Sequence, residues 1–108
     1  MSSKHILAAC ACVALAACSQ APEKTIEQEC VRLNLFSDIN SAADLKTSCS
    51  CLAGKLKDSM SEKDLKNLAK MLKDSKKSDD FDANAKKYEL SDAAAMTFVG
   101  AAKSCAFQ

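Results

Sequence analysis

Apolar residues recur at helical spacing between positions 42 and 60, and this segment organises the rest of the chain. They stand at offsets of 4, 7, 8, 11 and 15 residues, as Leu45, Cys49, Leu52, Ala53, Leu56 and Met60. One apolar stripe of this period predicts a single amphipathic helix. Cys51 lies outside the stripe, because two positions along a helix correspond to a rotation of roughly 200°.

Three more segments carry the signals of helices. The first covers residues 25–36, the second covers 61–75 and the last, which is rich in alanine, covers 91–107. Each begins with a hydroxyl residue that can cap a helix, and these are Thr25, Ser61 and Ser91. Residues 61–64 also have the form of a capping box, with Asp in place of the usual Glu.

Residues 76–90 are mostly polar and separate the last two helices. We expect Phe81, Tyr88 and Leu90 to dock on the domain there or to add a short helical turn. No segment alternates apolar and polar residues for long enough to predict a strand, and only two glycines and one proline are present to shape hairpins. The sequence therefore predicts an all-α fold, a small four-helix domain over residues 23–108.

The start of the chain has a different character. Lys4 and His5 precede a run of small and apolar residues from Ile6 to Ala17. A membrane-spanning helix needs about 20 apolar residues, and this run is shorter and stops at Cys18. The pattern predicts a secretory signal peptide over residues 1–17.

The end of this run, Leu15-Ala16-Ala17-Cys18, resembles the lipobox of bacterial lipoproteins. The resemblance implies that the Cys18 thiol receives a diacylglyceryl group, and that Cys18 becomes the mature N-terminus with a further acyl chain, such as palmitate, on its amine. Ser19 rather than Asp follows, which implies a lipid anchor in the outer membrane with the domain on its periplasmic side. Residues 18–22 would then be a short tether that keeps the domain near the membrane surface.

Two alternative cleavage sites compete with this interpretation. Ordinary secretion would use a site such as Ala14-Leu15-Ala16 and leave no lipid anchor. Leu7-Ala8-Ala9-Cys10 has the same four letters as the lipobox, but cleavage there would leave almost no hydrophobic core in the signal peptide. We therefore expect cleavage before Cys18.

Removing residues 1–17 changes the charge and the cysteine count. Lys4 is lost, so the 15 basic side chains fall to fourteen, equal to the 14 acidic ones, and no attraction to nucleic acid follows. Cys10 and Cys12 are also lost, and lipidation would use Cys18. Four cysteines remain in the domain, and they are Cys30, Cys49, Cys51 and Cys105.

Four cysteines in an oxidising compartment predict two disulfides, which so small an exported domain needs for stability. Cys49 and Cys51 point to opposite sides of one helix, so a bond between them is disfavoured. Two pairings remain open, Cys30–Cys49 with Cys51–Cys105 or the crossed arrangement. The first is preferred because Cys30 and Cys49 both lie on apolar stripes.

Cys49-Ser50-Cys51 also permits a redox interpretation, with the two thiols attacking and resolving a substrate disulfide. The usual redox motif has two intervening residues and lies at a helix start, where the helix dipole lowers the thiol pKa. Here the spacing is shorter and the predicted position is mid-helix. We expect a structural role for these cysteines, and no metal site, since the mature chain has no histidine.

The helix predicted over residues 61–75 carries lysines opposite its apolar face. That apolar face consists of Leu65, Leu68, Ala69 and Leu72. The five lysines of this stripe are Lys63, Lys66, Lys70, Lys73 and Lys77. Beside a lipid anchor, such a stripe favours contact with anionic phospholipid or lipopolysaccharide. The alternative is an ordinary solvent face in which Glu62 pairs with Lys66 and Lys70 pairs with Asp74.

Residues 80–84, Asp-Phe-Asp-Ala-Asn, match only the first half of a calcium-binding loop. Ala85 stands where that loop needs Gly, and Ser91 stands where it needs Glu, so we expect no calcium site. The mature chain also lacks histidine and a glycine-rich phosphate loop, and no spacing singles out a carboxylate pair. These features predict a protein that is not an enzyme and has no cofactor.

The sequence as a whole predicts a lipoprotein of the outer membrane that acts as a non-enzymatic interaction module. Its role would be that of an inhibitor, an immunity factor or an accessory of envelope assembly, with a protein or another envelope component as partner. The alternative is a thiol-disulfide redox protein of the envelope that uses Cys49 and Cys51.

Overall fold

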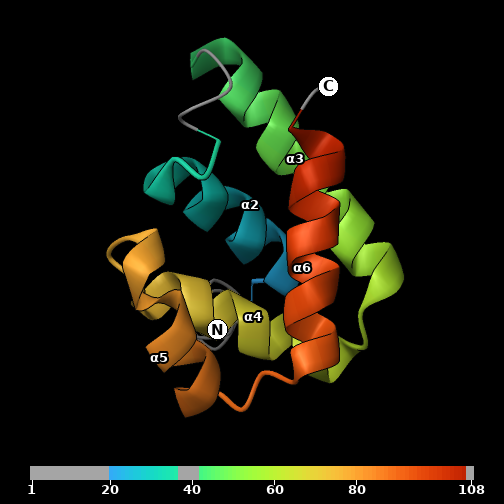
Figure 1. Cartoon of the computed structure of the whole chain (residues 1–108). Coiled ribbons are helices and arrows are strands. Elements are labelled where there is room, and N and C mark those ends of the chain that lie inside the picture. Colours follow the sequence, from blue (N-terminus) through green and yellow to red (C-terminus); the bar gives the residue numbers. More distant parts are fainter. Residues whose placement is uncertain (1–19, 37–41, 107–108) are drawn as a thin grey trace, which may run out of the picture.

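Five α-helices and one short 3-10 helix form the part of the chain that the computed structural model describes, residues 20–36 and 42–106 (Figure 1). The elements are α2 (Pro22–Leu33), α3 (Ala42–Ser59), α4 (Glu62–Asp74), η1 (Ser78–Asp80), α5 (Phe81–Lys87) and α6 (Asp92–Cys105). No strand occurs among these residues, so the predicted all-α fold is confirmed. The signal peptide, Cys18, the turn near residues 37–41 and Phe107 lie outside the described residues.

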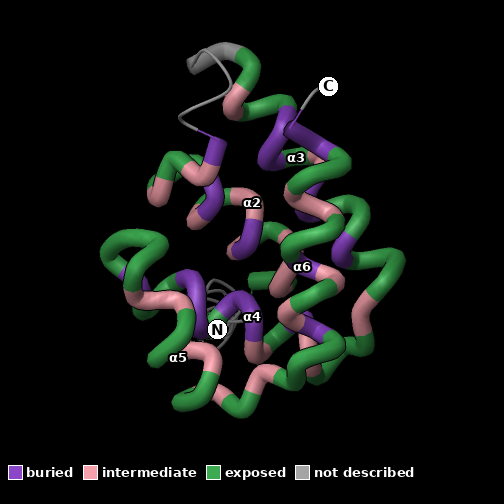
Figure 2. The backbone as a smooth tube through the Cα atoms, in the orientation of Figure 1, coloured by how far each residue is buried: buried purple, intermediate pink, exposed green. Residues whose placement is uncertain are grey.

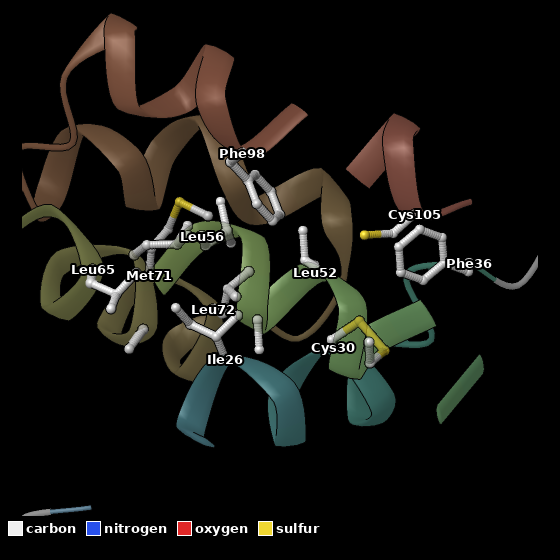
Figure 3. Close-up of a cluster of buried hydrophobic side chains, with 14 of the residues drawn as sticks. Ile26, Cys30, Phe36, Leu52, Leu56, Leu65, Met71, Leu72, Phe98 and Cys105 are labelled. Atoms are coloured by element: carbon white, nitrogen blue, oxygen red, sulfur yellow. A yellow bond between two sulfur atoms is a disulfide. The ribbon is translucent and has the colours of Figure 1, made fainter. Parts of the chain in front are cut away.

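Helix α3 is the central element of the domain. It packs against α2 and against α6, while α4 packs on α2 and carries α5 on its other side (Figure 1). The helices turn their buried faces toward one another and their exposed faces outward (Figure 2). Four of them contribute to one apolar core, in which Ile26 comes from α2, Leu52 and Leu56 from α3, Leu72 from α4 and Phe98 from α6 (Figure 3).

Two disulfides link α3 to its neighbours. Cys49 is bonded to Cys30 of α2, and Cys51 is bonded to Cys105 of α6. This is the first of the two pairings that the sequence leaves open, and the two bonds leave α3 on opposite sides, as helical rotation requires. Cys30, Cys49 and Cys105 are fully buried, whereas Cys51 is only partly buried.

Helix α2 differs from its predicted boundaries at both ends. It begins at Pro22 rather than at Thr25, because proline is well suited to the first helical turn, where its missing N–H costs no hydrogen bond. It ends at Leu33 because Asn34 adopts a left-handed conformation with φ 54°. The N–H groups of Asn34 and Leu35 then donate to the carbonyls of Val31 and Cys30 and close the helix.

Side-chain caps begin the helices α4 and α6 as predicted. The Ser61 hydroxyl accepts a hydrogen bond from the N–H of Asp64, and the Ser91 hydroxyl accepts one from the N–H of Ala94, each at 3.1 Å. These bonds satisfy backbone donors that have no partner within the helix. The two caps therefore fix where each helix starts.

The polar segment 76–90 contains more helix than the sequence predicts. The Asp80 carboxylate accepts hydrogen bonds from the N–H groups of Lys76 at 2.8 Å and Lys77 at 3.4 Å, and the first of these is the main reason that the pKa of Asp80 lies below its ordinary value. Phe81 then packs edge-on against Phe98, with ring centroids 6.1 Å apart. These contacts stabilise η1 and α5, so the described residues contain one α-helix more than the four predicted.

A hydrogen-bond network closes the C-terminal end of α4. The guanidinium of Arg32 donates to the carbonyls of Leu72 at 3.0 Å and Ser75 at 2.6 Å, at the helix end where carbonyls lose their usual backbone donors. The Leu72 carbonyl also accepts a hydrogen bond from the N–H of Ser75 at 3.1 Å. The buried Ser75 hydroxyl donates to the carbonyl of Met71 at 2.7 Å and accepts a hydrogen bond from Asn84 at 2.9 Å. One cluster of side chains thus joins α2, α4 and α5.

Candidate functional site

The lysines of α4 are exposed, as the helical pattern predicts. Lys63, Lys66, Lys70 and Lys73 all face solvent along this helix. The prediction is wrong for Lys77, because α4 ends at Asp74 and Lys77 lies beyond it with an extended backbone. The lysine stripe on the helix therefore has four members.

A groove runs beside this stripe, where the start of α2 packs near α4 and the end of α3. It encloses about 750 Å³. Its apolar lining includes Met60, Leu65 and Ala69, and its charged lining consists of Lys57, Lys66, Lys70, Lys73, Glu23 and Glu62. Gln20, the first described residue, also lines the groove, so the chain enters the domain here. We call this feature the α2–α4 groove.

The lysines of the α2–α4 groove differ in their partners. Lys57 pairs with Glu23, with 3.7 Å between the ammonium nitrogen and the carboxylate oxygen. Lys66, Lys70 and Lys73 form no ion pair with any other residue in 20–36 or 42–106. The pairs Glu62–Lys66 and Lys70–Asp74, which the sequence allows, are thus not formed. Three unpaired cations next to an apolar surface can hold an anionic group that has an apolar portion.

Sequence reasoning finds only part of this groove. The periodic pattern identifies Lys66, Lys70 and Lys73, since all three lie on one face of a single helix. It gives no sign of Lys57 or of residues 20–23, because they reach the groove only through the packing of α2 on α4. No short motif encodes that contact.

Asp74 and Tyr88 form a second polar cluster, between α4 and α5. The Tyr88 hydroxyl donates a hydrogen bond to the Asp74 carboxylate, and Lys87 donates to the same oxygen at 3.1 Å. The hydrogen bond to Tyr88, followed by the one to Lys87, lowers the pKa of Asp74. The same bond raises the pKa of Tyr88 above its ordinary value of 10.0, because it favours the protonated phenol.

This cluster predicts a pH dependence that can be observed directly. Tyr88 is the only tyrosine of the chain, so ultraviolet absorbance of tyrosinate follows it alone. We expect its titration midpoint above 10.0, and we expect Asp74→Ala to return the midpoint toward that value. Asp79→Ala is the control, because Asp79 is exposed and pairs with Lys77, away from the bond between Tyr88 and Asp74. Equal midpoints in the wild type and in Asp74→Ala would contradict the hydrogen bond.

The same shifts set the sign of the effect on stability. The pKa of Asp74 is lowered on folding, so its contribution is present above 3.8 and is lost as the pH falls through the folded pKa. The pKa of Tyr88 is raised, so its contribution is present below 10.0 and is lost as the pH rises through the folded pKa. The attachment of α5 to α4 should therefore weaken at both extremes of pH.

The cysteines of the Cys49-Ser50-Cys51 motif are not bonded to each other. Cys49 is fully buried in its bond to Cys30, whereas Cys51 lines a shallow surface depression together with Lys46 and Ser50. Of the four disulfide-bonded cysteines in the described residues, only Cys51 is not fully buried. Any exchange with an external thiol would begin there.

The half-match to a calcium loop folds as helix. Residues 80–84 span the end of η1 and the start of α5. The Asp80 carboxylate accepts hydrogen bonds from the backbone N–H groups of Lys76 and Lys77, and the Asn84 side-chain amide donates one to the Ser75 hydroxyl. Within residues 20–36 and 42–106, no three histidine, cysteine or acidic side chains are grouped so that they could hold a metal ion.

In the described part of the chain, none of the helices has both the length and the apolar character needed to cross a bilayer. Neither a protein-family model, a curated protein nor a solved structure gives a significant match to this chain.

Proposed function

We propose that this chain is a bacterial outer-membrane lipoprotein, anchored through Cys18, whose helical domain is a non-enzymatic interaction module on the periplasmic side. One observation carries the proposal: α2 begins at Pro22, only four residues after the lipobox cysteine. So short a connection would hold the domain at the membrane surface, since each residue of extended chain spans at most about 3.6 Å.

Two further features support this role. The four cysteines of the described domain are all used in disulfides, which suits a small domain in an oxidising compartment. The α2–α4 groove opens beside Gln20, and three of its lysines have no ion-pair partner among the described residues. A charged groove beside the anchor would be available to an envelope component.

The test is the chemical state of Cys18. We expect mass spectrometry of the mature protein to find Cys18 at the N-terminus with three acyl chains, and cells fed an alkyne analogue of palmitate to label the protein. Cys18→Ser should abolish the label and release the protein from the membrane fraction. Cys10→Ser is the matched control, because it removes the cysteine of the other Leu-Ala-Ala-Cys sequence and should change neither result. An unmodified mature N-terminus after Ala16 would contradict the proposal.

A thiol-disulfide redox protein is the second candidate, and the partial exposure of Cys51 favours it. An external thiolate would attack the Cys51 sulfur, form a mixed disulfide and release the Cys105 thiolate. The interaction module predicts a reduction potential below about −300 mV for this bond, as for structural disulfides of secreted proteins, and a redox protein predicts a higher one. Equilibration of the purified protein with glutathione buffers measures the difference.

A further inference from the structure

We infer that the α2–α4 groove binds one anionic phospholipid of the membrane, with the phosphate-bearing headgroup on Lys66, Lys70 and Lys73 and part of an acyl chain along the apolar lining. This inference rests on the proposed function, because it takes Cys18 to be the membrane anchor. It adds the ligand class and the residues that would bind it.

The arrangement of charge is the first reason. Lys66, Lys70 and Lys73 are spaced by four and three residues, so they lie on one face of α4, and all three line the groove. None has an ion-pair partner among the described residues, whereas Lys57 on the same rim is paired with Glu23. Three unpaired ammonium groups around one groove suit a phosphate group, to which lysine is attracted as a point charge.

The lining of the groove is the second reason. Its accessible apolar lining comes from Ala21, which is exposed, and from Pro22 and Met60, which are partly buried. Leu65 and Ala69 also line it but are buried. A free inorganic anion would leave this apolar surface in water, whereas an acyl chain would cover it. The combination of cations and apolar side chains therefore favours a lipid over a free anion.

The position of the groove is the third reason. Gln20 lines it, and Cys18 is only two residues earlier, a span of at most about 7 Å. Attachment of Cys18 would place the groove next to lipid headgroups. Binding of a lipid there would also fix the orientation of the domain on the membrane.

The experiment uses the full lipidated protein in a non-ionic detergent. Phosphatidylglycerol, phosphatidylcholine and inorganic phosphate are added in separate titrations, and native mass spectrometry counts the bound molecules. We expect one phosphatidylglycerol per protein, weaker binding of phosphatidylcholine because its headgroup has no net charge, and no displacement of the lipid by inorganic phosphate.

Two triple variants with equal charge change locate the site. Lys66→Gln, Lys70→Gln and Lys73→Gln together should weaken phosphatidylglycerol binding about 100-fold, if each well-placed lysine contributes about what it does at an anionic membrane. The control replaces Lys76, Lys86 and Lys103 with Gln. These three lysines are exposed, and they neither line the groove nor belong to the lysine stripe of α4. It should stay within about threefold of the wild type, because exposed charges farther away are screened by salt.

A gain of affinity provides an independent check. Glu62 is the acidic residue of the rim without an ion-pair partner among the described residues, so Glu62→Gln should tighten phosphatidylglycerol binding up to about fivefold. Such a gain cannot arise from damage to the fold.

Several results would overturn the inference. An equal loss in both triple variants would mean a diffuse attraction and not a groove site. Equal binding of phosphatidylcholine, or displacement of the lipid by inorganic phosphate, would exclude an anionic lipid as the ligand. The intact mass of the same sample reports whether Cys18 carries lipid, so failure of the proposed function is seen separately from failure of the groove.

Discussion

Replacing both Cys51 and Cys105 with alanine is expected to lower the free energy of unfolding by about 4 kcal/mol. This disulfide closes the longer of the two loops, with a sequence separation of 54 residues, and so removes the more entropy from the unfolded chain. Because α6 packs chiefly on α3, its amides should also exchange with solvent faster than those of α2 and α4. Urea unfolding and hydrogen exchange measure the two effects.

The matched control removes the other disulfide. Cys30→Ala with Cys49→Ala opens a loop with a sequence separation of only 19 residues, so the same entropic reasoning gives a loss of about 3 kcal/mol. Its exchange should increase in α2 rather than in α6. If removal of the Cys51–Cys105 bond costs less than about 1 kcal/mol, packing alone holds α6, and the stapled architecture is not what stabilises the domain.

Leu56→Ala is expected to cost about 3 kcal/mol, within the range measured for fully buried leucines. Leu56 is completely buried in α3 and points into the core shared with Ile26 and Leu72 (Figure 3). Alanine keeps the helix propensity of the site but leaves a cavity that the surrounding helices fill only in part. Thermal or urea unfolding of the oxidised protein measures the loss.

Met96→Ala is the corresponding surface control. The Met96 side chain on α6 is 74% exposed, so its truncation should change the free energy of unfolding by less than about 0.5 kcal/mol. If Met96→Ala costs as much as Leu56→Ala, the outer face of α6 is packed against something that the described helices do not supply.

Local signals were sufficient for most of the fold. The apolar stripe of α3 needs only helical periodicity, and Cys49, Leu52, Ala53 and Leu56 are all buried as that stripe requires. Ser61 and Ser91 cap their helices because short polar side chains reach the first unpaired N–H groups. The separate partners of Cys49 and Cys51 follow from rotation along one helix.

The missed elements depend on contacts between segments far apart in the chain. Helix α5 has few apolar residues of its own, and it is fixed by Phe81 on Phe98 and by Tyr88 on Asp74. The end of α4 at Asp74 lies within one residue of the predicted end, and what was missed is that hydrogen bonds from Arg32 of α2 accompany it. Neither contact leaves a periodic trace in the local sequence.

The candidate site, like the fold, was predictable only where it depends on local sequence. Helical spacing places Lys66, Lys70 and Lys73 on one face, but a solvated lysine face and the edge of a groove give the same pattern. The position of the start of α2 distinguishes a groove edge from a solvated lysine face, and that position depends on how the core packs. The early start of α2 at Pro22 reflects a local proline preference that the sequence does contain.

The order of the two disulfides along the chain has a consequence for maturation. Among the bonded cysteines of the described domain, the first two in sequence are joined to each other and so are the last two, so the two loops follow one another without nesting or crossing. In a chain that enters an oxidising compartment from its N-terminus, Cys105 arrives long after the other three, and only Cys51, two residues after Cys49, can compete for Cys30. Oxidation in strict order of arrival would yield the native pairing, Cys30–Cys49 first and Cys51–Cys105 second.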